Sequence, residues 1–120
     1  MNDTITNATV QVSWQPTDRQ PNVNPTDVTI SPGGQVTWQI TLPKGYTVQI
    51  EFAVKDGVKG PFPVSGQPDN PSQGLFEGPS GSITSAAATG ADGTDWKYGV
   101  AVYQGTTRVS YVDPMVKIRR

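Results

Sequence analysis

Apolar and polar residues alternate along three segments of the chain, at residues 9–15, 35–42 and 46–54. A period of two residues is typical of a half-buried β-strand, because successive side chains point to opposite faces. The outward positions are mainly Gln and Thr, and a slip of one residue in the pairing would bury them. The positions expected to point inward are Val10, Val12, Trp14, Val36, Trp38, Ile40, Leu42, Val48, Ile50, Phe52 and Val54.

Shorter strands separated by turns complete the pattern. Val28 and Ile30 predict a short strand, and the Ser-Pro-Gly-Gly turn at residues 31–34 leads from it into the next strand, which predicts a hairpin. Alternation over residues 96–102 is followed by a Gln-Gly-Thr turn and by two further short strands, the last of which ends near Ile118. No window shows the 3.6-residue periodicity of an amphipathic helix.

Seven or eight short strands in 120 residues predict an all-β fold, a two-sheet Greek-key sandwich. The length fits one domain that covers residues 1–120. A chain of this size buries roughly two thirds of its unfolded surface, so a core can form without a metal ion or a disulfide bond.

A long loop at residues 55–81 interrupts the regular pattern. This stretch contains six Gly and five Pro, a composition that excludes a central strand. Three large apolar residues in it favour order, and we expect Phe62 and Phe76 to pack over one end of the sandwich. Loops on a rigid scaffold often carry function, so exposed aromatic rings that contact a partner are the other interpretation.

The composition excludes several kinds of chemistry. The chain has no Cys and no His, which removes the usual ligands of zinc and copper and the usual bases for a Ser nucleophile. Its formal net charge is −1, and the one basic cluster is at residues 117–120, so nucleic-acid binding is not expected.

Three segments resemble a known family. Residues 28–38 (VTISPGGQVTW) resemble the strand, Pro/Gly turn and VTW strand of the first hairpin in cupredoxins. Residues 96–100 (WKYGV) resemble the aromatic-x-Tyr-x-Cys strand of that family, and residues 113–118 (DPMVKI) resemble the closing strand of members that have lost the metal. The resemblance implies a cupredoxin-like sandwich. An immunoglobulin-like sandwich is the alternative, because it shares the alternation and the turns.

The resemblance does not extend to a copper site. A blue-copper centre uses two His and one Cys with a weak axial Met. Val100 stands where the family has its Cys, and residues 39–46, where the first His is expected, contain none. Met115 alone does not make a site. The resemblance therefore implies a metal-free member, and we expect no cofactor.

Carboxylates are the main chemical groups that remain, and they form no strong motif. Asp92 and Asp95 lie in a segment that suits either a calcium loop or an ordinary turn, and the turn is the favoured interpretation. Glycoside hydrolysis needs two acids across a cleft, but Glu51 is on an outward strand face and Glu77 is in the long loop. We therefore predict that the protein is not an enzyme.

Tyr103 is the aromatic residue that departs from the core pattern. It falls on the opposite phase to Tyr98, Val100 and Val102, so we expect it on an open sheet face with the outward Gln and Thr side chains. Aromatic rings on such a face also stack on sugars, which makes a carbohydrate-binding module an alternative function.

These observations predict a non-enzymatic protein-interaction or structural module, with an uncharacterised hydrolase as a second alternative to carbohydrate binding. The expected partner is another protein or a second copy of the chain. No signal peptide or membrane-spanning segment is recognisable, and the lack of Cys is typical of the cytoplasm, although disulfide-free secreted bacterial domains share it. The candidate contact residues are Phe62, Phe76, Glu77 and Tyr103.

Overall fold

The computed structural model describes residues 5–52, 54–55, 58–59, 61, 74–77, 80–85, 87–89 and 92–119, with the backbone alone at 54–55, 58–59, 74–77 and 80. The secondary-structure elements of these residues are all β-strands, and none of the residues belongs to a helix that is long and apolar enough to cross a membrane. The strands are β1 (Ala8–Ser13), β2 (Asn22–Asn24), β3 (Asp27–Ile30), β4 (Val36–Thr41), β5 (Tyr46–Phe52), β6 (Val54–Lys55), β7 (Val58–Lys59), β8 (Gly74–Glu77), β9 (Ser80–Thr84), β10 (Asp95–Gln104), β11 (Thr107–Val112) and β12 (Met115–Ile118).

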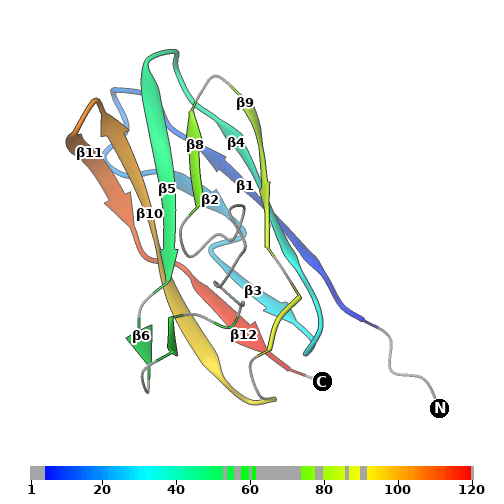
Figure 1. The fold of residues 1–120 in the computed structure, drawn as a ribbon. Coiled ribbons are helices and arrows are strands. Elements are labelled where there is room, and N and C mark those ends of the chain that lie inside the picture. Colours follow the sequence, from blue (N-terminus) through cyan, green and yellow to red (C-terminus); the bar gives the residue numbers. More distant parts are fainter. Residues whose placement is uncertain are drawn as a thin grey trace.

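The strands form two principal sheets packed as a sandwich-like pair of layers (Figure 1). The smaller sheet has the order β2-β1-β4-β9, and the larger has the order β3-β12-β10-β5-β8, with β11 also paired to β10. β6 and β7 form a separate two-stranded sheet. Each principal sheet contains one parallel pair, β1 with β4 and β3 with β12. The prediction of an all-β, two-sheet architecture is confirmed.

The core lies between the two sheets, where the alternation predicts it. The inward residues that the sequence predicts in β1, β4 and β5 are buried, and four apolar or aromatic residues of β10 at the same two-residue spacing are buried as well. β1, β4 and β5 therefore each have one apolar face in the core and one mainly polar face outside. For Val54, on β6, the backbone alone is described.

An aromatic cluster at the centre of the core joins the two sheets. Trp38 on β4 donates its indole N–H to the hydroxyl of Tyr98 on β10, with the two atoms 3.0 Å apart. Tyr98 also stacks on Phe52 of β5, with ring centroids 5.0 Å apart. Burial raises the pKa of Tyr98 to about 12, although the hydrogen bond from Trp38 acts in the opposite direction.

The turn at residues 31–34 does not join a hairpin, and this part of the sequence prediction is wrong. β3 pairs with β12 in the larger sheet, whereas β4 pairs with β1 and β9 in the smaller one, so the chain crosses between the sheets. The N-terminal segment takes the place beside β4, where Ala8 donates its backbone N–H to the carbonyl of Gln35. β3 and β4 face the same core from opposite sheets. Their apolar and polar residues therefore alternate in the same way whether they pair as a hairpin or lie in different sheets.

The Gly- and Pro-rich stretch at 55–81 includes strands. β7 pairs with β6, β8 pairs with β5, and β9 pairs with β4. β8 ends the strand order of the larger sheet, a position that fits a segment with too much Gly and Pro for a central strand. Phe62 lies outside the described residues and Phe76 has its backbone alone described, so their packing over the sandwich stays a prediction.

Candidate functional site

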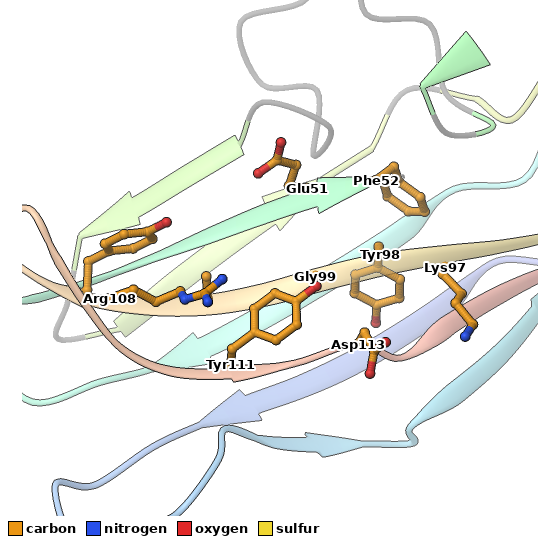
Figure 2. Close-up of a pocket in the computed structure, with 10 residues that line it drawn as sticks. Glu51, Phe52, Lys97, Tyr98, Gly99, Arg108, Tyr111 and Asp113 are labelled. Carbon is orange, nitrogen blue, oxygen red and sulfur yellow. The ribbon is translucent and has the colours of Figure 1, made fainter. Parts of the chain in front are cut away.

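A hollow of about 260 Å³ lies beside β5, β10 and β11 of the larger sheet (Figure 2). We call it the Tyr–Arg groove, after the three side chains Tyr103, Arg108 and Tyr111 that line it. The other residues around the groove are Glu51, Phe52, Lys97, Tyr98, Gly99, Ala101 and Asp113.

β10 supplies the floor of the groove. Tyr98 points into the core, so the residues on either side of it in the alternation, Lys97 and Gly99, point outward together with Ala101. The small residues leave space that Tyr111 partly fills. A Cβ added to Gly99 would lie 2.7 Å from Cε2 of Tyr111 and 2.8 Å from its hydroxyl oxygen. The absence of a side chain at Gly99 therefore lets the tyrosine ring approach the sheet closely.

A β-bulge brings Arg108 to the face that carries Tyr111. Tyr111 and Ser110 lie opposite consecutive residues of β10, but the pairing then skips Val109, so that Arg108 lies opposite Tyr103. Residues three positions apart on a regular strand point to opposite faces. The extra residue reverses this relation, and re-aiming side chains in this way is a common effect of bulges near functional sites.

The guanidinium of Arg108 lies over the ring of Tyr111, with Cζ 4.9 Å from the ring centroid. This is a cation–π contact, which holds the guanidinium plane and leaves its N–H donors for other partners. Arg108, Lys97 and Asp113 form no ion pair within the described part of the chain. Figure 2 shows Arg108 beside Tyr111, with Lys97 toward the other end of the groove. The groove thus offers charges of both signs and aromatic rings to a ligand.

Of the contact residues predicted from the sequence, Tyr103 is in the Tyr–Arg groove, where it is half-buried and pairs with Thr47 of β5. Phe76 and Glu77 lie on β8, the strand beyond β5, and their backbones alone are described. Phe62 is outside the described residues. The structure therefore does not bring the four candidates together as one described site.

The sequence alone does not identify the other residues of the groove, among them Arg108, Tyr111 and Gly99. Arg108 and Tyr111 fall on opposite faces if alternation is taken as strict, so the bulge hides their proximity. In the sequence, Gly99 is a glycine inside a strand, a residue that ordinarily weakens strand stability. A glycine inside an alternating strand does, however, signal a close approach by another group, and here that group is Tyr111.

The acidic segment at Asp92 and Asp95 forms a turn and an ion pair. Asp92 and Gly93 make the turn, with Gly93 at φ 88°, as the favoured interpretation of the sequence predicts. Asp95 Oδ1 lies 2.7 Å from the Arg119 guanidinium. Nowhere in the described residues do three or more acidic side chains gather as metal ligands. Val100, on β10, is fully buried in the core.

Comparison with protein-family models and with curated proteins gives no match to this sequence. The case for a function therefore rests on the geometry of the Tyr–Arg groove.

Proposed function

We propose that the protein is a non-enzymatic protein-interaction module, which binds its partner at the Tyr–Arg groove of a metal-free cupredoxin-like scaffold. The observation that carries this proposal is the placement of Tyr103, Tyr111 and the bulge-positioned Arg108 around a floor of small residues. Tyr and Arg are enriched among the residues that dominate protein–protein binding, above all where they surround a pocket.

The size and charge of the groove support a protein partner. Its volume of about 260 Å³ is below the roughly 300–1,000 Å³ of small-molecule sites, and it suits one or two anchoring side chains. Lys97, Arg108 and Asp113 add charges of both signs to the lining. An apolar anchor surrounded by polar and charged groups is the usual anatomy of a protein interface.

Carbohydrate binding is the second candidate, and the presence of Tyr103 in the groove favours it. A sugar ring needs an open aromatic face on which to stack. Arg108 covers one face of the Tyr111 ring, and part of the ring and its hydroxyl lie against Gly99. Among the aromatic side chains described in the groove, Tyr103 is therefore the better platform, and a single platform is a weaker basis for sugar binding than for a protein contact.

The strand pairing supports a cupredoxin-like scaffold over the immunoglobulin-like alternative. Both sheets of an immunoglobulin domain are antiparallel. Here each principal sheet contains a parallel pair, and the chain crosses from one sheet to the other between β3 and β4.

The test is a quantitative affinity enrichment from the native host, which compares the wild type with two double variants. Tyr103→Ala with Arg108→Ala removes two walls of the groove. The control, Gln39→Ala with Ser82→Ala, alters an exposed cross-strand pair on the smaller sheet. We expect partners that the wild type and the control retain to be lost from the groove variant. Equal retention by both folded variants would refute the proposal, and glycan-array binding that depends on Tyr103 would favour the carbohydrate alternative.

A further inference from the structure

β11 has a free edge. It pairs with β10 on one side, and no described strand pairs with its other side. Figure 1 shows β11 at the outside of the larger sheet. An unpaired edge presents backbone N–H and C=O groups that can pair with another chain, and proteins usually blunt such edges with Pro, charged side chains or bulges. β11 contains no Pro, and its bulge at Val109 and its one charged residue, Arg108, leave Ser110, Tyr111 and Val112 as a regular edge.

β11 also carries exposed apolar surface. Val109 is 39% exposed and Tyr111 is 45% exposed, and Ile5 is the other exposed large apolar residue in the described part of the chain. Ile5 lies on the N-terminal segment, away from β11 in sequence. Two exposed apolar side chains within the six residues of β11 make this edge a surface whose burial against a partner is favourable.

The charges beside this edge are self-complementary. Arg108, near the start of β11, and Asp113, just after its end, line the same groove as Tyr111. Neither has an ion-pair partner within the described residues. In a dimer with a two-fold axis, every contact between the copies occurs twice, with the roles of the two copies exchanged. A basic residue on one side of the axis and an acidic residue on the other side therefore form two identical contacts.

We propose that β11 pairs antiparallel with β11 of a second copy, around a two-fold axis at Tyr111. Counting outward from Tyr111, Ser110 then lies opposite Val112 of the second copy, and both residues are on the core side of the strand. Because Val109 is the extra residue of the bulge, the next position is Arg108, which lies opposite Asp113 of the second copy on the outer face.

The bulge is what makes this register self-consistent. Without an extra residue at Val109, Arg108 would fall on the face opposite to Asp113, and the two charges would not meet across the axis. In the proposed dimer the larger sheets of the two copies join, and the two Tyr–Arg grooves lie next to each other on one face. The inference does not rest on the proposed function, since it concerns the strand edge and not what occupies the groove.

The test is sedimentation velocity on the purified chain over about 1 μM to 1 mM, a range that covers weak to moderate affinities. The variants are Arg108→Asp, Asp113→Arg and the double charge swap. Lys97→Glu is the control, because it reverses a charge in the same groove on β10, away from the edge. Circular dichroism establishes that each variant is folded.

We expect the wild type and the Lys97→Glu control to dimerise with increasing concentration, both single reversals to weaken the dimer at least tenfold, and the double swap to restore it. A wild type that stays monomeric at the highest concentration would overturn the inference and leave the groove proposal standing. A dimer whose affinity is unchanged by both single charge reversals would place the interface elsewhere. Failure of the folded double swap to restore the dimer would refute the register.

Discussion

Replacing Tyr98 with Phe isolates the hydrogen bond at the centre of the core. The substitution removes a single oxygen and keeps the ring, so the stacking on Phe52 and the edge contact with Trp38 are retained. The indole N–H of Trp38 then loses its acceptor at a site that is fully buried, with Trp38 at 0% exposure. The change therefore tests one polar contact without opening a large cavity.

The expected loss in unfolding free energy is about 1–3 kcal/mol, the cost of leaving a buried donor without an acceptor. A matched control is available at the edge of the same core. Tyr46 is half-buried and packs against the core, and its hydroxyl makes no hydrogen bond within the described residues. Tyr46→Phe removes the same single oxygen without leaving a buried donor unpaired, so we expect it to cost less unfolding free energy than Tyr98→Phe.

The burial of Tyr98 gives the fold a pH dependence at high pH. The pKa of Tyr98 is raised from 10.0 to about 12 in the folded protein, chiefly by burial. The neutral phenol is therefore favoured in the folded state, and its contribution is fully present below pH 10 and is lost as the pH rises from 10 to about 12. Two units of pKa correspond to about 3 kcal/mol. Tyr98→Phe lacks this titration and should lose less stability across the same window.

Urea unfolding followed by tryptophan fluorescence, at pH 7 and at several values between pH 9 and 12, measures both effects. The two proteins differ by one oxygen atom, at Tyr98, so the difference between their stabilities reports on that residue. A Tyr98→Phe protein within about 0.5 kcal/mol of the wild type at pH 7, the range of surface substitutions, would refute the reasoning. So would identical losses of stability above pH 10.

Three further changes test other parts of the structure. Trp38→Ala should lower the unfolding free energy by about 3–5 kcal/mol in urea titrations, because it leaves a cavity in the core. Gly99→Ala should leave the protein folded but displace Tyr111 from the floor of the groove, which nuclear magnetic resonance detects as shifted ring signals. Asp95→Asn should cost less than about 1 kcal/mol by the same urea assay, since both side chains of the pair with Arg119 are more than one third exposed.

Much of the fold follows from the sequence because burial imposes a period of two on β1, β4, β5 and β10. The alternation predicts the buried residues of β1, β4 and β5, and the Gln-Gly-Thr turn predicts the β10–β11 hairpin. Which strands pair with each other is harder to predict from the sequence. Val28 and Ile30 of β3 show the same pattern whether β3 pairs with β4 or with β12, because both arrangements bury the same face. Strand pairing depends on contacts far apart in the chain.

The candidate site was predictable at one position. Tyr103 departs from the apolar phase of β10, and this places it on the outer face. Arg108 and Tyr111 were not predictable, because a bulge of one residue changes the face of a side chain and leaves no mark in the hydrophobic pattern. The role of Gly99 depends on a ring from the neighbouring strand, which local sequence does not specify.

The most direct test of the proposed function is site-specific photo-cross-linking in the native host. A photoreactive amino acid at Lys97 samples the Tyr–Arg groove away from the β11 edge, and the same residue at Ser82 samples the exposed face of the smaller sheet. We predict a discrete adduct with a protein partner from position 97, lost when Arg108 is replaced by Ala, and no such adduct from position 82. Adducts from position 82 alone, or adducts from position 97 that are unchanged by Arg108→Ala, would contradict the assignment of the groove as the binding surface.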